Sequence, residues 1–299
     1  MILRALAAAV ALLPWRSLGA LGHVLGVLAG SLLRVRRRVV EGAIRAAGLT
    51  HPARVARRAY AGLGAGVFEL LWLAGASRSR RDRIVEQHVT LEPELEATIE
   101  AALAKGPVVF AASHTGNWEL AAHAAARLVG RHGRGLMVVA KPMALAGFDA
   151  FCRRLREGLG ISLASPKGAV TTTAAALARG DAVAMMIDQV PDHPRHGVWA
   201  PFLGRPALCD RAPAAIARRA GATFIVVAAK RRGRRHVVTL LEAHDARERN
   251  VVELTRSATA ALDRFVRAEP PEWLWLHRRW KEPRATRASL ALVARGFPG

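Results

Sequence analysis

The hydrophobic pattern divides the chain into an apolar N-terminal segment and a longer part in which strand-like and helix-like stretches alternate. Ala, Leu, Val and Gly dominate the first 33 residues. Their cleaner half, residues 17–33, is at the short end of the roughly 17–25 residues that a membrane-spanning helix needs. The basic run Arg-Val-Arg-Arg-Arg follows at 34–38, and such a run favours the cytoplasmic side of a membrane and anionic lipid. We therefore expect residues 1–33 to form a membrane anchor helix and residues 34–299 to form a single domain.

The apolar pattern leaves the nature of this anchor open. It fits a helix that spans the bilayer and also a helix that lies in its interface. Two other interpretations are a cleaved signal peptide and a buried helix of a soluble domain. Arg4 before a short apolar run favours the signal peptide, but Pro14-Trp15-Arg16 followed by more apolar sequence fits it poorly.

Beyond the anchor, the pattern predicts helices first and then alternating strands and helices. Residues 35–104 look helical, with apolar residues at helical spacing over 54–73 and no strand pattern. After Lys105-Gly106, short apolar runs predict strands at 107–112, 136–140, 161–163, 182–187, 223–229 and 236–241. The stretches between them predict helices at 120–129, 148–159, 171–178, 212–220 and 251–266. This alternation indicates an α/β fold with a largely parallel central sheet flanked by helices.

The charge narrows the class of partner. The 299 residues include 45 Lys and Arg against 23 Asp and Glu, a formal charge of +22. A basic surface attracts nucleic acid, anionic lipid or an acidic carrier protein. A single Tyr, an aromatic content of 5% and the lack of a recognised binding motif argue against nucleic acid. The two cysteines, Cys152 and Cys209, form no pattern typical of a zinc site or a disulfide framework.

Candidate chemistry is concentrated at residues 113–119, Ser-His-Thr-Gly-Asn-Trp-Glu, between the first predicted strand of the sheet and a helix. Ligands of open α/β sheets bind beyond the carboxyl ends of strands. A turn at Gly116 can bring Glu119 to one nitrogen of His114 and leave the other nitrogen for a substrate hydroxyl, while Asn117 can cap the helix. The segment therefore predicts a general base, His114, that Glu119 orients.

Six blocks stand out in order along the chain: HTGNWEL at 114–120, VVAKP at 138–142, RRLREGLG at 153–160, MMIDQ at 185–189, GVWAPFLGRPA at 197–207 and PEWLWLHRRWK at 271–281. Together they resemble the bacterial lipid A late acyltransferases. These are the lauroyl and myristoyl transferases of Kdo-lipid A, in a family that also includes phosphatidylinositol mannoside acyltransferases. Leu203, where a second Phe is common, and the stretch 209–213 depart from the family pattern. These departures concern the preference for acyl chain and acceptor.

The resemblance implies transfer of an acyl chain from an acyl carrier protein or coenzyme A thioester to a hydroxyl of an anionic membrane lipid. It implies a glycerolipid acyltransferase-like domain at the cytoplasmic face of the bacterial inner membrane, without metal or cofactor. A lipid A precursor is the expected acceptor, and another glycolipid or a lysophospholipid is the alternative. The expected substrate-binding residues are Asn117, Lys141, Arg156, Asp188, Gln189, Arg278 and Arg279.

Three tryptophans in the last block have two interpretations. Trp273, Trp275 and Trp280 stand beside His277 and three basic residues. Aromatic rings beside cations suit a lipid interface or a phosphate contact. A core strand with alternating Trp is the alternative, and both hold if Arg278 and Arg279 point in opposite directions.

Overall fold

A computed structural model describes residues 2–143 and 145–281, and its centre is a seven-stranded sheet. The strand order is β1-β9-β8-β2-β5-β3-β4. All neighbours are parallel except β8 and β9, which form an antiparallel hairpin. The strands are β1 (Val89–Leu91), β2 (Val108–Ala112), β3 (Leu136–Val139), β4 (Ile161–Ala164), β5 (Ala182–Met186), β8 (Thr223–Arg232) and β9 (Arg235–Asp245). The predicted α/β fold with a largely parallel sheet is confirmed.

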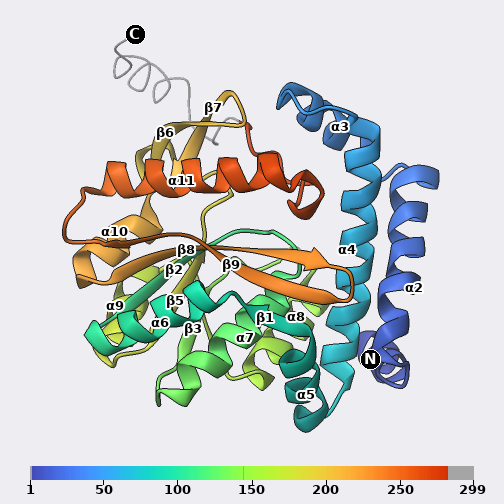
Figure 1. The fold of residues 1–299 in the computed structure, drawn as a ribbon, viewed down its shortest axis with the longest axis horizontal. Helices are drawn as coiled ribbons and strands as arrows, with labels where there is room; N and C mark the ends of the chain where they lie inside the picture. The colour runs from blue at the N-terminus through green and yellow to red at the C-terminus, as the bar shows by residue number, and fades with distance from the viewer. Residues whose placement is uncertain (1, 144, 282–299) are drawn as a thin grey trace.

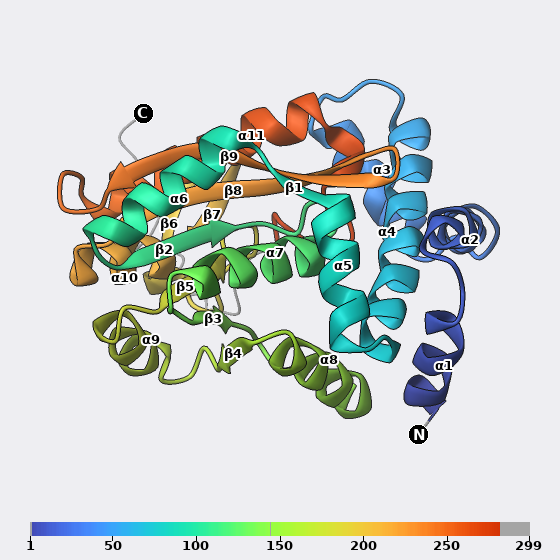
Figure 2. The same ribbon diagram turned by 60° about the horizontal axis from the view of Figure 1, so that its bottom comes forward.

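Helices cover both faces of this sheet (Figures 1 and 2). Crossover helices are expected here, because parallel neighbours cannot be joined by a tight turn. The helices that cover the sheet are α6 (Pro93–Lys105), α7 (Trp118–Arg131), α8 (Ala146–Gly158), α9 (Ala169–Ala178), α10 (Ala212–Ala220) and α11 (Val251–Ala268), of which α11 follows the last strand. Short 3-10 turns, η2 (Pro194–His196) and η3 (Pro270–Glu272), complete this part of the chain.

The N-terminal helices stand together at one end of the sheet (Figures 1 and 2). They are α1 (Ile2–Ala11), α2 (Trp15–Val27) with its π-helical continuation η1 (Leu28–Leu32), α3 (Arg37–Ala46), α4 (Pro52–Gly75) and α5 (Arg78–His88). Among the described residues, no single helix is both long and apolar enough to cross a bilayer. Only Trp15–Leu32 taken together with Arg37–Ala46, bent away by 89°, meets both criteria. The expected anchor of residues 1–33 is thus indicated only weakly, and the division of the chain at that point stays a prediction.

Two strand regions differ from the sequence prediction. Residues 35–104 were expected to hold no strand, but Val89–Leu91 forms edge strand β1 beside β9. Three residues are too few to show a period of two, so the pattern gave no signal there. The segment after β5 forms an antiparallel hairpin of β6 (Gly197–Phe202) and β7 (Arg205–Asp210), which is not part of the central sheet.

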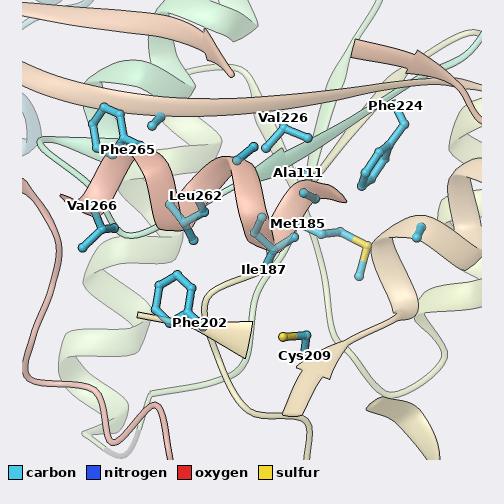
Figure 3. Packing of buried hydrophobic residues seen from close by; sticks show 14 of the residues in the cluster. Ala111, Met185, Ile187, Phe202, Cys209, Phe224, Val226, Leu262, Phe265 and Val266 are labelled. Carbon is cyan, nitrogen blue, oxygen red and sulfur yellow. The ribbon is translucent and has the colours of Figure 1, made fainter. Parts of the chain in front are cut away.

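Two hydrophobic clusters hold these layers together. One lies between the sheet, α10, α11 and the β6–β7 hairpin, where Phe202 of β6 is fully buried near Leu262 and Phe265 of α11 (Figure 3). The other lies under α6, α7 and α8 and continues to α1 and α4. Burial on both faces explains why the strands are short apolar runs rather than alternating ones.

Candidate active site

His114 and Asp188 meet because two parallel strands end side by side. Strands β2 and β5 pair in parallel, with Ala112 opposite Met186. His114 and Asp188 each lie two residues beyond that pair. Nδ1 of His114 lies 2.9 Å from Oδ1 of Asp188, and the backbone N–H of His114 donates to Oδ2 at 3.0 Å. The carboxylate thus fixes both the ring and the backbone of His114, and it favours the tautomer with the proton on Nδ1.

The environment of this pair sets its protonation. Burial opposes a positive charge on His114, but the Asp188 carboxylate outweighs burial and raises the pKa of His114 above 6.5. Burial also opposes the charge of Asp188, which is fully buried, yet the charge and hydrogen bonds of His114 hold the pKa of Asp188 well below its usual range. No described residue hydrogen-bonds to Nε2 of His114, whose side chain is 15% exposed. Neutral His114 therefore has a free lone pair for a substrate proton.

The C-terminal block secures this pair from the other side. The indole N–H of Trp273 donates to Oδ2 of Asp188 at 3.0 Å. Backbone bonds join Leu274 N to His114 O at 3.0 Å and Gly116 N to Glu272 O at 2.8 Å. Trp273 is 1% exposed. The loop that carries His114 is therefore held between β5 and the segment after α11.

Steric constraints require glycine at position 116 of this loop. Gly116 has a φ of +53°, which a residue with a side chain rarely adopts. A Cβ added there would also lie 2.7 Å from the carbonyl oxygen of Ala229 on β8. Thr115 completes this contact, because its Oγ1 accepts from the backbone N–H of Ala229 at 3.0 Å.

Glu119 lies in the first turn of α7 but does not contact His114 as the sequence analysis expected. It accepts from Arg156 of α8, with Nε–Oε2 at 3.0 Å and Nη2–Oε1 at 2.5 Å. Asp188 takes the place expected for Glu119, because the parallel pairing of β2 and β5 brings it closer to Nδ1. Burial opposes the charge of Arg156, but its bonds to Glu119 raise the pKa of the guanidinium.

An apolar pocket opens beside this ion pair. It encloses about 840 Å³, measured out to its open mouth, between the sheet and helices α6 and α7. Its polar lining residues are Ser113, Glu119 and Arg156, next to His114 in the chain or in space. The rest of the lining is almost wholly apolar and includes Leu95, Ile99, Phe110, Ala121, Ala122, Ala125, Leu136, Ile161, Ala184, Val227 and Val238. This apolar lining suits a long hydrocarbon.

Comparison with known families agrees with this arrangement. The family model described as bacterial lipid A biosynthesis acyltransferase matches residues 2–282. The chain belongs to this family. No curated protein matches it. Its chemistry is therefore that of an acyltransferase of lipid A biosynthesis, and the resemblance carried by the six sequence blocks is confirmed.

Asn117 of the acyltransferase lies in a buried polar network. Its Oδ1 caps α7 by accepting from Leu120 N at 3.1 Å, and its Nδ2 donates to Oε2 of Glu69 at 2.7 Å. Glu69, on α4, also accepts both arms of Arg231 at 2.7 and 2.8 Å and lies 3.3 Å from Nε2 of His236. Both ends of the Asn117 amide are thus used within the protein.

The other expected substrate-binding residues of the acyltransferase are scattered. Lys141 is exposed and pairs with Asp192 at 2.8 Å, and Gln189 is partly buried. Arg278 is exposed, whereas Arg279 is 2% exposed and donates to Leu208 O at 2.7 Å and to Sγ of Cys209 at 2.9 Å. The structure therefore brings Arg156 and Asp188 to His114 but leaves Arg279 in the core.

Three residues near the site were missed or underrated by sequence reasoning. Glu69 was missed, although a lone acid inside the apolar end of α4 is a signal of a buried pair. Trp273 was considered for a lipid interface or the core, and it contacts Asp188. The ring of His277 lies 4.8 Å from that of His114, and burial and the charge of His114 lower the pKa of His277 to about 4. His277 is therefore neutral near pH 7 and adds no positive charge beside His114.

Proposed function

We propose that the protein transfers a fatty acyl chain from an acyl carrier protein or coenzyme A thioester to a hydroxyl of a lipid A precursor. The observation that carries the proposal is an oriented base beside an apolar pocket. His114 has a free Nε2 backed by Asp188, and the pocket lined by α6 and α7 reaches the Glu119–Arg156 pair. In a family of acyltransferases, such a pocket is suited to hold the acyl chain with its thioester near His114.

In the proposed mechanism, Nε2 of His114 takes the proton of the acceptor hydroxyl as its oxygen attacks the thioester carbonyl. The attack forms the new C–O bond and places negative charge on the carbonyl oxygen. Collapse of the tetrahedral intermediate breaks the C–S bond, and the departing thiolate takes the proton from His114. The ester, the free thiol and neutral His114 remain, so no covalent acyl–enzyme is needed.

Asp188 has the orienting role in this mechanism. It stabilises the imidazolium that forms when His114 takes the proton, as the carboxylate of a catalytic triad does. Trp273 in turn holds Asp188, which keeps the carboxylate from rotating away.

Arg156 is suited to stabilise the developing oxyanion. Two of its nitrogens, Nε and Nη2, bond to Glu119, and Nη1 is outside both bonds. Glu119 thereby fixes the guanidinium at the pocket, and a fixed cation where charge develops stabilises a transition state. Glu119 is accordingly proposed to act through Arg156 rather than through His114.

The family and the charge support the proposed acceptor class and location. We propose the cytoplasmic face of the bacterial inner membrane, since both the donor carriers and lipid A precursors are anionic and the chain carries +22. Basic docking of this kind weakens with salt.

Mass spectrometry of membrane lipids from cells with and without the protein tests the proposal. The expected difference is one acyl chain on a lipid A species, and it should be absent with His114→Ala. An added chain on another glycolipid or on a lysophospholipid would replace the proposed acceptor and keep the chemistry. An unchanged lipid profile with well-expressed protein would contradict the proposed function.

A further inference from the structure

One face of helix α2 packs against the rest of the protein. Leu18, Gly22 and Gly26 are buried on this face, and they pack on α4. A Cβ added to Gly26 would lie 1.9 Å from the carbonyl oxygen of Tyr60, and one added to Gly22 would lie 2.3 Å from Cα of Ala65. The two backbones are therefore in direct contact, as at helix crossings built from small residues. Lipid has no access to this side of α2.

Polar bonds fix the same segment along the length of α4. The indole N–H of Trp72 donates to the carbonyl of Leu13 at 3.1 Å. The hydroxyl of Tyr60, near the other end of α4, donates to the carbonyl of Val35. Helix α1 is equally close, because a Cβ on Gly75 would lie 2.1 Å from the carbonyl oxygen of Ala7. Helix α2 thus runs antiparallel to α4, and α1 packs against the end of α4 at Gly75.

A second face of α2 and η1, beside the one that meets α4, carries a stripe of exposed apolar side chains. Its members recur every three or four residues and have exposed fractions between 43% and 72%. They are Leu21, Val24, Leu25, Leu28 and Leu32. Ile2, Leu6 and Leu12 of the α1 segment are exposed as well. An apolar stripe at helical spacing on a protein surface is typical of an interaction face.

Charge indicates what covers this stripe. Residues 1–40 contain six arginines and no acidic residue. Arg4, Arg16, Arg34, Arg36 and Arg38 are exposed around the ends of the helices. A cationic rim around an apolar stripe complements an anionic bilayer surface, where apolar side chains enter the acyl boundary and arginines meet the headgroups.

We propose that α1, α2 and η1, here called the docking layer, lie in the plane of an anionic bilayer and do not cross it. A crossing helix is surrounded by lipid, protein partners or both over its whole length. If α2 crossed, α4 would cross with it, and α4 carries exposed Arg54, Arg57 and Arg58. Charged side chains at that depth are costly unless they are paired. Lying in the plane exposes only the leucine stripe to lipid.

Helix α4 links the docking layer to the loop that carries His114. The face of α4 that does not meet α2 carries Glu69, which accepts from Asn117 at 2.7 Å, three residues after His114. Helix α4 therefore contacts both the docking layer and the catalytic loop. The inference rests on the proposed function, because a membrane lipid is there the acceptor.

Labelling across a sealed membrane tests the orientation. Arg4→Cys and Arg38→Cys are made separately in the full chain, where the native Cys152 and Cys209 are buried. Inverted inner-membrane vesicles, with the cytoplasmic face outward, are treated with a membrane-impermeant maleimide. Both variants should label fully without detergent. Labelling of either one only after detergent is added would overturn the proposal in favour of a crossing segment or another topology.

Vesicle binding tests whether an anionic bilayer covers the apolar stripe. Purified protein should bind phosphatidylglycerol-containing vesicles at least tenfold more tightly than its Leu25→Glu/Leu28→Glu variant, because that variant places two charges in the stripe. Val252→Glu, at an exposed apolar position on α11, is the matched control and should bind within twofold of the unmodified protein. Equal binding by the double variant would overturn the proposal. So would a dimer of the unmodified protein that the double substitution dissociates and the control substitution does not. Transfer to acceptor in detergent micelles should persist in the double variant, which separates lost docking from a failure of the proposed chemistry.

Discussion

Asp188→Asn should remove most of the activity while leaving the fold intact. Oδ2 of Asp188 accepts from two donors, the backbone N–H of His114 and the indole of Trp273, whereas Oδ1 faces only Nδ1 of His114. The amide NH₂ of Asn is therefore expected at the Oδ1 position, where it donates to Nδ1. That bond moves the ring proton to Nε2, so the base cannot accept a substrate proton. The same tautomer error in a serine protease triad costs about 10,000-fold in kcat, and we expect roughly 1,000- to 10,000-fold, about 4–5 kcal/mol.

A pH profile gives this variant a second readout. Only neutral His114 acts as a base, so kcat/KM should rise with pH through the pKa of His114. Asp188 holds that pKa above 6.5 against burial, and without the carboxylate burial should lower it. The acid limb of Asp188→Asn should therefore move to lower pH. Asp181→Asn is the matched control, since Asp181 lies at the other end of β5 and accepts from Gly135 N. Activity within tenfold of the unmodified enzyme, with an unmoved acid limb, would refute the reasoning.

Three further substitutions follow from the same contacts. Trp273→Phe removes a donor from the carboxylate that faces His114, so it should lower kcat about tenfold and move the acid limb of kcat/KM to higher pH. Ala122→Phe fills part of the apolar pocket and should shift the preferred acyl donor to a shorter chain in a competition assay. Glu69→Gln leaves Arg231 without its buried counter-ion and should cost about 3 kcal/mol of unfolding free energy in denaturant. Burial opposes the charge of Glu69, but its polar partners lower its pKa to about 2, so this stability should be lost as pH falls from about 4.5 toward 2.

Each of these has a control or a contradicting result. Trp275→Phe removes an indole that bonds to the carbonyl of Pro270 and should leave the pH profile unchanged. An unchanged chain preference in folded Ala122→Phe would contradict the assignment of the pocket. Glu94→Gln, at an exposed position of α6, should have little effect on stability, and an equal loss in both Glu variants would contradict the role of the buried network.

The fold was largely predictable because its signals are local. Short apolar runs separated by helical stretches predicted six strands of the sheet and the helices between them. The three-residue β1 was not predictable, because its pairing with β9 is a tertiary contact. The β6–β7 hairpin was missed because the glycine and proline in its sequence are as typical of an irregular loop as of a hairpin.

Sequence reasoning named four residues that lie together, but it missed how they pair and also named residues that lie elsewhere, such as the buried Arg279. His114, Glu119, Arg156 and Asp188 all meet near the pocket, as their sequence blocks suggested. The prediction that Glu119 is the partner of His114 was wrong, however. Proximity in sequence favoured Glu119, whereas the register of β2 with β5 places Asp188 beside His114. Such a register is invisible without the sheet order.

The central claim is that His114 is the base for acyl transfer to a lipid hydroxyl. The most direct measurement is transfer from an acyl thioester to a lipid A precursor in detergent micelles, by the purified protein and by its His114→Ala variant, with His132→Ala, an exposed position at the end of α7, as control. We predict an acylated product with the unmodified protein and with His132→Ala, and a loss of at least 1,000-fold with His114→Ala. Substantial transfer by folded His114→Ala would contradict the account.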